Sequence, residues 1–492
     1  MTLLIFFPKP GGHTLQRFDT QLRVGLIGLG LESYWPQFEG LKQRLEGYLE
    51  LVSRKVEESG RRSILMGLVD TPEKAVDAGH ACRTEDIDIL LVYVTTYALS
   101  STVLPVIQRA KVPVILLNLV PAAAIDYVKF NRLGDRTAMT GEWLAFCSAC
   151  PVPEIANVLR RLDIPFQQVT GMLENDPQCW ADLEGWLKAA DVVKTMNHCR
   201  LGLMGHYYSG MLDIATDLVQ VSGRFGTLIH IFEVDELSAI RRAVTPPEVE
   251  KKLSDFHDFF ALDDECPPEE LTRAATTAAA LDQLVRRKGI DMLAYYYSGS
   301  GIPENENTMS SIILGTSMLT GRGVPVAGEY EVKNVLAMKI LDELGAGGSF
   351  TEYYAMDFTD DLVLMGHDGP GHPRIAQEKI RVRPLPVYHG KVGRGLSVEM
   401  AVKHGPVTLL SIVEDKQHGF RLLVAEGESV PGPILEIGNT NSRYRFPIGA
   451  RGFSEAWNAQ GPAHHCAIGI GNLGNQLRKL AALMNLGFHQ VC

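Results

Sequence analysis

Several short stretches of this chain place acidic or histidine side chains beside apolar runs or in glycine-rich turns, where chemistry can be carried out. The first is Tyr-Ser-Gly-Ser-Gly-Ile-Pro-Glu-Asn-Glu-Asn-Thr at residues 297–308, directly after a predicted strand. Polar loops at the carboxyl ends of strands are where open α/β sheets bind ligands. Glu304 and Glu306 could therefore bind a metal or act as acid and base. The alternative is a solvated turn whose carboxylates cap the next helix.

A second candidate is Glu329, which follows an apolar run and Gly328. It stands just before a helix predicted over residues 331–344, whose dipole would favour an ionised carboxylate that faces a cleft. The alternative is ordinary charge complementarity at a helix N-terminus, which suits Glu331 better than Glu329.

The third candidate is Asp357, which stands between Met356 and Phe358. An acid inside an apolar strand is costly unless it is paired, hydrogen-bonded or bound to a metal. A further apolar run leads into His367 and His372, and this pattern indicates either the rim of a site or a tight turn.

The fourth candidate is the pair His464 and His465 in a loop of small residues, Gln-Gly-Pro-Ala-His-His-Cys. Adjacent side chains point in different directions, so that one could bind a metal while the other meets a substrate. A purely structural pair is the alternative. Two glutamates, one aspartate and one histidine could hold a hard divalent ion such as Mn²⁺ or Mg²⁺. Carboxylate-rich ligation without cysteine argues against structural zinc.

Apolar runs separated by helical stretches must position these residues. Strands are predicted in the first part of the chain at residues 23–30, 63–69, 88–94 and 112–118, in the second at 192–196, 227–233 and 291–297, and in the third at 379–384, 407–413 and 420–425. Helical patterns cover residues 38–58, 246–281 and 331–344. Continuous apolar strands between helices indicate parallel sheets that are covered on both faces.

The predicted fold class is therefore α/β, with two doubly wound parallel-sheet α/β domains followed by a mostly antiparallel, β barrel-like C-terminal domain. The predicted domains are an N-terminal α/β domain at residues 1–171, a central α/β domain at 172–322, and a β-rich domain at 323–492 that carries metal ligands.

Composition excludes several classes of protein. The chain has 492 residues, 46% hydrophobic and 21% charged, as expected of a globular protein. Its net charge of -11 argues against a nucleic-acid partner and suits a small, often neutral ligand. The apolar N-terminal run is too short for a signal peptide, and no stretch approaches the roughly 18 residues of a membrane helix. A cytoplasmic location with no membrane partner is therefore expected.

Taken in order, a series of segments resembles the L-arabinose isomerase family. They are Gly-Leu-Glu-Ser-Tyr-Trp-Pro (30–36), Asn-Arg-Leu-Gly-Asp-Arg (131–136), Gly-Glu-Tyr-Glu-Val-Lys (328–333), Gly-Ser-Phe-Thr-Glu-Tyr-Tyr-Ala-Met-Asp-Phe (348–358), Asp-Leu-Val-Leu-Met-Gly-His (361–367), Ser-Glu-Ala-Trp (454–457) and Gly-Pro-Ala-His-His (461–465). Their order and spacing carry the resemblance, because no single motif is decisive.

The resemblance implies roles for individual residues. Glu329 is expected to be a metal ligand and a catalytic acid/base, and His465 a metal ligand. Glu306 is the best match to the family's other catalytic glutamate, also a ligand, with Glu304 as its rival and a substrate contact. His464 and Glu32 are the other expected substrate contacts.

Two positions depart from the arabinose isomerase pattern. Asp357, expected here as a metal ligand, stands where these enzymes usually have histidine, and a Glu-Asp-His ligand set is similar to that of L-fucose isomerases. Glu32 stands where they carry glutamine.

The function that the resemblance implies is metal-dependent aldose–ketose isomerisation in arabinose catabolism, from L-arabinose to L-ribulose, through a cis-enediol with glutamate as acid/base. The implied cofactor is Mn²⁺ or another divalent ion such as Mg²⁺ or Co²⁺. The family implies a homotrimer or homohexamer with shared active sites. The alternatives are an L-fucose/D-arabinose-type isomerase, which Asp357 favours, and a non-catalytic sugar-binding protein on the same fold.

Overall fold

The computed structural model describes residues 19–299, 301–386, 393–415 and 419–492. The short apolar run at the N-terminus lies outside these residues. Within the described ranges, no helix is both long enough and apolar enough to cross a membrane.

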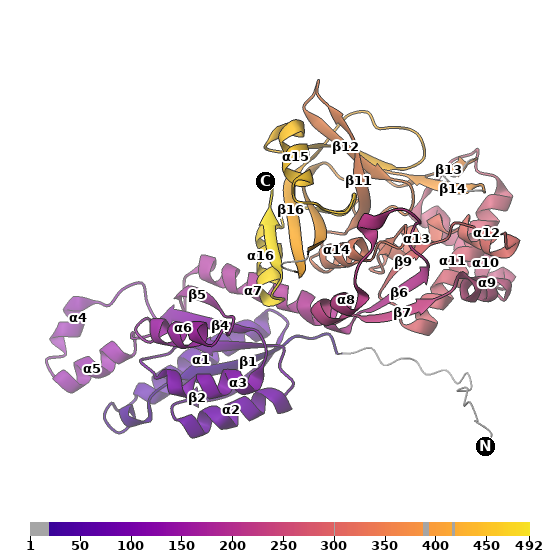
Figure 1. The fold of residues 1–492 in the computed structure, drawn as a ribbon. Helices are drawn as coiled ribbons and strands as arrows, with labels where there is room; N and C mark the ends of the chain where they lie inside the picture. Colours follow the sequence, from indigo (N-terminus) through magenta and orange to yellow (C-terminus); the bar gives the residue numbers. More distant parts are fainter. Residues whose placement is uncertain (1–18, 300, 387–392, 416–418) are drawn as a thin grey trace, which may run out of the picture.

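The first sheet has five parallel strands in the order β2-β1-β3-β4-β5 (Figure 1). They are β1 (Arg23–Leu29), β2 (Arg62–Val69), β3 (Ile89–Tyr93), β4 (Val114–Val120) and β5 (Gln167–Met172). The connecting helices are η1 (Glu32–Tyr34), α1 (Leu41–Glu58), α2 (Pro72–Thr84), η2 (Ser100–Thr102), α3 (Leu104–Ala110), α4 (Tyr127–Arg132), α5 (Arg136–Leu144), α6 (Val152–Arg161) and α7 (Pro177–His198). One core cluster packs α2, α3 and α6 on this sheet and another packs α1 and α7 on it, which explains the almost continuous apolar strands.

The second sheet has four parallel strands in the order β10-β9-β6-β7. They are β6 (Arg200–Gly205), β7 (Leu228–Phe232), β9 (Met292–Tyr296) and β10 (Val326–Ala327). Its helices are η3 (Leu212–Ile214), α8 (Leu218–Phe225), α9 (Val234–Arg242), α10 (Pro246–Phe259), α11 (Pro268–Lys288), α12 (Pro303–Met309) and α13 (Ile313–Gly321). The chain passes from β6 to β7 on one side and returns to β9 on the other. This reversal opens a crevice at the carboxyl ends of β6 and β9.

The predicted strand at residues 192–196 is wrong, because these residues form the last turns of the long helix α7. Asp176 caps that helix, accepting a hydrogen bond from the N–H of Cys179, and Pro177 opens its first turn. A short apolar run inside a buried helix has the same pattern as a buried strand. The strand of this region is β6, which begins two residues after α7 ends.

The third sheet has seven strands in the order β15-β18-β11-β12-β17-β16-β19, antiparallel except for the pair β16 and β19. They are β11 (Ser349–Asp357), β12 (Leu362–His367), β15 (Gly405–Asp415), β16 (Gly419–Val430), β17 (Thr440–Arg445), β18 (His465–Ile470) and β19 (Gly487–Gln490). Strand β15 also pairs with β16, so the pairings return to their starting strand. A largely antiparallel C-terminal sheet is thus confirmed, while its barrel-like form stays a prediction.

A smaller sheet joins β8 (Ala261–Leu262), β13 (Arg381–Leu385) and β14 (Gly395–Glu399), and α15 (Gly449–Asn458) and α16 (Gly474–Leu483) complete the C-terminal part. The predicted domain boundaries also stay predictions.

Helix α14 (Val332–Glu343) lies between the second and third sheets and is buried over ten of its twelve residues. A single core cluster joins Ala294 of β9, Leu336 of α14 and Ala467 of β18. The Asn334 side chain donates to the carbonyl of Cys466 at 3.2 Å. The segment just before α14 is therefore held against the start of β18, where the two adjacent histidines stand.

Candidate active site

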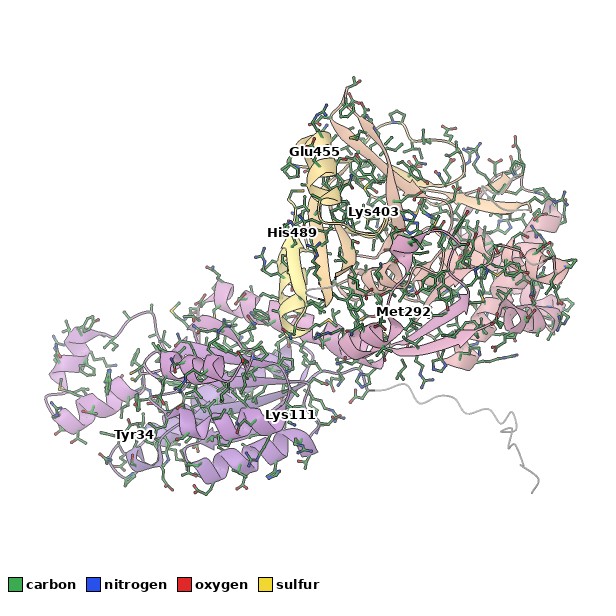
Figure 2. All side chains as sticks on the ribbon, viewed as in Figure 1. Tyr34, Lys111, Met292, Lys403, Glu455 and His489 are labelled. Atoms are coloured by element: carbon green, nitrogen blue, oxygen red, sulfur yellow. The ribbon has the colours of Figure 1, made fainter. Side chains whose placement is uncertain are left out.

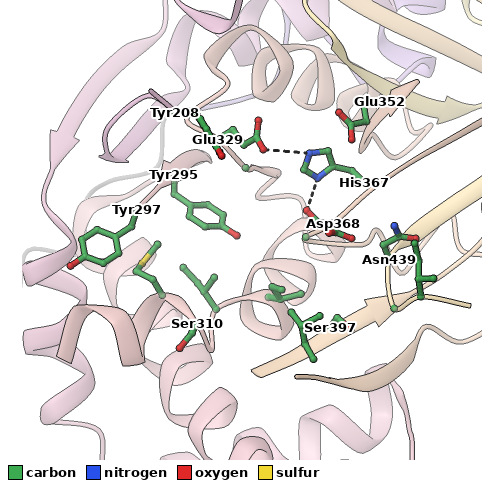
Figure 3. A pocket seen from close by; sticks show the side chains of 18 of the residues that line it. Tyr208, Tyr295, Tyr297, Ser310, Glu329, Glu352, His367, Asp368, Ser397 and Asn439 are labelled. Carbon is green, nitrogen blue, oxygen red and sulfur yellow. Dashed lines mark hydrogen bonds and ion pairs between the residues drawn. The ribbon is translucent and has the colours of Figure 1, made fainter. Parts of the chain in front are cut away.

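A cavity of about 860 Å³ opens between the second and third sheets, and we call it the site cavity (Figure 3). Its lining comes from the end of β9, from α12 and α13, from the turn before α14, from β11 and β12, and from the loop at residues 435–439. It therefore extends from the crevice of the second sheet, as expected for an α/β protein.

Glu329 reaches this cavity from a tight turn between β10 and α14. Glu329 and Tyr330 have φ values of 57° and 63°, which non-glycine residues adopt rarely. The Tyr330 N–H donates to Tyr295 and the Glu331 N–H to Gly328, both at 3.0 Å, which holds the turn. A strained turn that places a carboxylate in a cavity is typical of a functional site.

Glu352 and His465 lie opposite one another on β11 and β18, as partners in an antiparallel pair. Such partners present their side chains on the same face of a sheet. Nε2 of His465 lies 3.9 Å from Oε2 of Glu352 and 3.3 Å from Oε2 of Glu329. The pairing of β11 with β18 therefore brings together carboxylates and an imidazole from three distant segments.

His367, the last residue of β12, completes the cluster. Its Nδ1 lies 2.5 Å from the carbonyl oxygen of Asp368, to which it can donate, and its Nε2 lies 4.0 Å from Oε1 of Glu329 (Figure 3). A donor at Nδ1 leaves Nε2 with its lone pair toward Glu329, which is the tautomer a metal ligand needs.

Burial keeps His465 neutral. Its side chain is fully buried, and burial together with the neighbouring His367 and His464 holds its pKa well below the usual value. Within the described residues neither ring nitrogen makes a hydrogen bond. A neutral, buried imidazole without hydrogen bonds, between two carboxylates, has the chemistry of a metal ligand.

Two overlapping groups of side chains have ligand atoms within 4.8 Å of one another: Glu329, His464 and His465, and Glu352, His367 and His465. A set of carboxylates and imidazoles suits divalent ions such as Mn²⁺. The residues present therefore fit the divalent ion that the sequence implies.

Glu331 stands behind the cluster, with Oε2 at 3.5 Å from Nδ1 of His465. Complete burial raises its pKa to about 8; Lys333 lowers this pKa, whereas Asp213 and Glu329 raise it. A group with this pKa holds its proton at neutral pH, so Glu331 places an uncharged carboxyl group beside His465 in the metal-free protein.

Of the residues predicted from sequence, Glu329, His464 and His465 are brought together. Glu306 lines the same cavity, where its Oε1 accepts from the N–H of Gly301 at 3.1 Å, but it belongs to neither ligand group. Glu304 pairs with Arg242 and is not among the residues that line the cavity.

Asp357, an expected ligand, lies apart from both ligand groups. Its Oδ1 accepts from the N–H groups of Thr359 and Asp360 at 2.9 and 3.0 Å, in the turn between β11 and β12. It lies five residues from Glu352 along β11, or roughly 16 Å at strand spacing. Its neighbours Met356 and Phe358 are 41% and 59% exposed, so the apolar surroundings that suggested burial belong to a solvent-facing turn.

Sequence reasoning missed Glu352 and gave His367 only a place at the rim. Glu352 was inside a stretch that resembled the family, and alternation along the strand puts it on the same face as Phe350. That signal was available, but only the pairing of β11 with β18 shows what Glu352 faces.

Glu32 lies in the short helix η1 after β1, is exposed, and is not among the residues that line the site cavity. Figure 2 shows Tyr34 of the same turn in the N-terminal part, well apart from Met292 and Lys403 in the rest of the molecule. Within one chain, Glu32 does not join the candidate site.

Comparison with known proteins agrees with the resemblance. Residues 347–487 match the family of the L-arabinose isomerase C-terminal domain. The chain is 22% identical to an L-arabinose isomerase of Aeromonas salmonicida (strain A449) over 427 residues, covering 84% of this chain and 82% of that protein. It is 24% identical to one of Thermotoga sp. (strain RQ2) over 319 residues, covering 63% and 62%.

A solved periplasmic solute-binding protein from Actinobacillus succinogenes 130z, with bound D-allose, covers 63% of this chain and 78% of its own at 10% identity. Its TM-score of 0.16 is too low to support any conclusion.

The α/β fold that ends in an antiparallel sheet, the carboxylate–histidine cluster at a cavity and these relatives, which are named L-arabinose isomerases, together support an isomerase enzyme. More narrowly, the family match covers residues 347–487, and the similarity to L-arabinose isomerases extends over up to 84% of the chain at 22–24% identity.

Proposed function

We propose that this isomerase interconverts an aldose and its ketose, with L-arabinose and L-ribulose as the first pair to test. The proposed cofactor is a divalent ion, Mn²⁺ first, held by Glu329, Glu352, His367 and His465. The observation that supports this proposal is the convergence of these four side chains from four segments, with Glu329, Glu352 and His367 lining the site cavity and His465 buried beside them.

The chain's own residues account for the proton transfers. A bound divalent ion would supply Lewis-acid polarisation of the oxygens at C1 and C2 of an open-chain sugar. In the proposed cis-enediol route, one of the two carboxylates, Glu329 or Glu352, takes the proton from C2 and returns it to C1. The other moves the hydroxyl proton between the two oxygens. A positioned acid or base of this kind contributes about 10²–10⁴-fold to the rate.

The alternatives lose support in different ways. The L-fucose/D-arabinose alternative depended on Asp357, which ends β11 and accepts hydrogen bonds from the turn that follows, apart from both ligand groups. The non-catalytic reading gives no reason for two carboxylates beside a buried neutral histidine, which is costly to assemble without a ligand.

The direct test uses protein stripped with a chelator and then given Mn²⁺, assayed in deuterated water against aldopentoses and 6-deoxyhexoses. We expect metal-dependent ketose formation, with solvent deuterium at C1 of the ketose. Ketose without deuterium would replace the enediol route by a hydride shift. A protein that binds Mn²⁺ but forms ketose from none of these sugars would contradict the proposal.

We also propose that the active form is a homotrimer or homohexamer in which Glu32 contacts the substrate of a neighbouring copy. Glu32 is exposed and is not among the residues that line the site cavity of its own chain, which supports a role between copies.

A further inference from the structure

His464 and His465 each have a carboxyl group close to Nδ1, whereas Nε2 of each ring faces Glu329 and Glu352. Behind His465 it is Glu331 and behind His464 it is Asp213, which comes from the central part of the chain. Asp213 lies in η3, within the segment that follows β6 at the crevice of the second sheet. Sequence analysis did not single out this residue.

The contact between Asp213 and His464 is double. Oδ2 of Asp213 lies 2.6 Å from Nδ1 of His464 and also accepts from the backbone N–H of His464 at 3.0 Å. The backbone N–H can only donate, so Oδ2 of Asp213 is an acceptor in this double contact. Since this oxygen accepts, Nδ1 of His464 must carry the proton.

This tautomer decides what the other ring nitrogen does. Nε2 of His464 lies 3.8 Å from Oε2 of Glu329 and 3.9 Å from Oε2 of Glu352. With Nδ1 protonated, Nε2 has a lone pair that faces the two carboxylates. The His464 side chain is 37% exposed, so a hydroxyl of a sugar at these carboxylates can reach it.

The segment that holds Asp213 is fixed independently of His464. Lys333, in the first turn of α14, donates to the carbonyl oxygens of Asp213 at 2.6 Å and of Ala215 at 3.5 Å. Ile214 is fully buried, and the Thr216 hydroxyl donates to Glu414 on β15 at 2.6 Å. Asp213 is therefore placed by α14, the core and the third sheet before any ligand arrives.

We propose that Asp213 is a positioning residue that holds the His464 ring in its Nδ1–H tautomer, with Nε2 directed at the carboxylates that meet the substrate. The arrangement is that of an acid orienting a histidine in a catalytic triad. The inference rests on the proposed function for its catalytic consequence, whereas the tautomer itself can be measured without turnover.

The first measurement is the rate at which diethyl pyrocarbonate modifies His464 in metal-free protein, followed by peptide mass spectrometry. In Asp213→Asn the amide can donate to Nδ1, which shifts the proton to Nε2 and removes the reactive lone pair. We expect modification of His464 to slow several-fold, while His230, which is exposed on β7, serves as the internal reference. An unchanged rate at His464 would overturn the proposal.

The second measurement is a double-mutant cycle on the Mn²⁺-loaded enzyme. Asp213→Asn should lower kcat/KM about 10–100-fold in the wild-type background. It should have almost no effect in a His464→Gln background, because Asp213 would act only through that ring. An equal loss in both backgrounds would show a structural role and would also overturn the proposal.

Asp217→Asn is the matched control, since it removes a charge from the same segment and asparagine still caps α8. It should leave both readouts unchanged, and an equal change in this variant would attribute the effect to charge alone and overturn the proposal. If no sugar is turned over but Asp213→Asn still slows the modification of His464, the proposed function fails and the positioning role stands.

Discussion

At the scale of single residues, the roles of Glu352 and Glu306 beside Glu329 can be separated. Glu352 belongs to a ligand group, whereas Glu306 only lines the cavity and accepts from Gly301. Glu329→Gln and Glu352→Gln should each lower kcat about 10²–10⁴-fold. Glu306→Gln should lower it less than about tenfold. The measurements are initial rates and bound Mn²⁺ by mass spectrometry.

Asp357→Asn is the control for these variants, because its carboxylate lies in the turn between β11 and β12 and should leave both rate and metal content unchanged. A loss in Glu306→Gln as large as that in Glu329→Gln would restore Glu306 to the catalytic role that the sequence suggested.

The raised pKa of Glu331 predicts that the stability of the metal-free protein depends on pH. Burial raises its pKa to about 8, above the ordinary value of 4.5. Between these values the folded protein holds a proton that the unfolded chain has released, so stability is full below about pH 4.5 and is lost as the pH rises through 8. We expect the melting temperature of the metal-free wild type to fall from pH 6 to 9 more than that of Glu331→Gln. Parallel pH profiles for the two proteins would contradict this reading.

At the scale of elements, the sequence predicted most strands of the first sheet and the helix before which Glu329 stands, because these follow from apolar runs and helical spacing. It did not recognise β6, and it assigned a strand to the end of α7, because periodicity cannot separate a short buried helix segment from a strand. The site was predicted in part for a related reason. Glu329, His464 and His465 are marked by local glycine turns, whereas Glu352 gains its meaning only from the register of β11 with β18.

The close approach of β6 and β9 at the crevice predicts that a side chain at position 205 destabilises the protein. Gly205 ends β6 with a φ of 89°, and a Cβ there would lie 1.9 Å from the carbonyl oxygen of Tyr296 on β9. Gly205→Ala should therefore destabilise the protein by about 1–3 kcal/mol beyond the strain of its φ. Gly210→Ala is the control, since its φ is 96° but no atom lies within 4 Å of the added carbon. Urea unfolding of both variants measures the difference in their free energies of unfolding. Equal losses of stability would show that backbone strain alone, and not the contact with Tyr296, causes the destabilisation.

At the scale of the whole molecule, the residues that we propose to contact the metal and the substrate lie in two separate parts of the chain. The ligand groups lie between the second and third sheets, and Glu32 lies at the first sheet, on the part of the chain that extends away from them (Figure 1). One copy alone cannot bring Glu32 to its own cavity in this arrangement. The proposal of shared sites therefore makes a prediction that concerns the assembly and not any one chain.

Mixing two defective variants tests that prediction. Glu32→Ala and Glu329→Gln should each be inactive alone, for loss of a substrate contact and of a ligand. If each site takes Glu32 from one copy and Glu329 from another, co-expressed variants should recover activity, because roughly a quarter of the sites in randomly mixed closed oligomers receive both intact residues. The measurement is the specific activity of oligomers that carry two different affinity tags, with the oligomer size checked by light scattering. Full activity in Glu32→Ala would show that Glu32 makes no essential contact with the substrate. Mixed oligomers without recovered activity would show that each site is formed within a single chain.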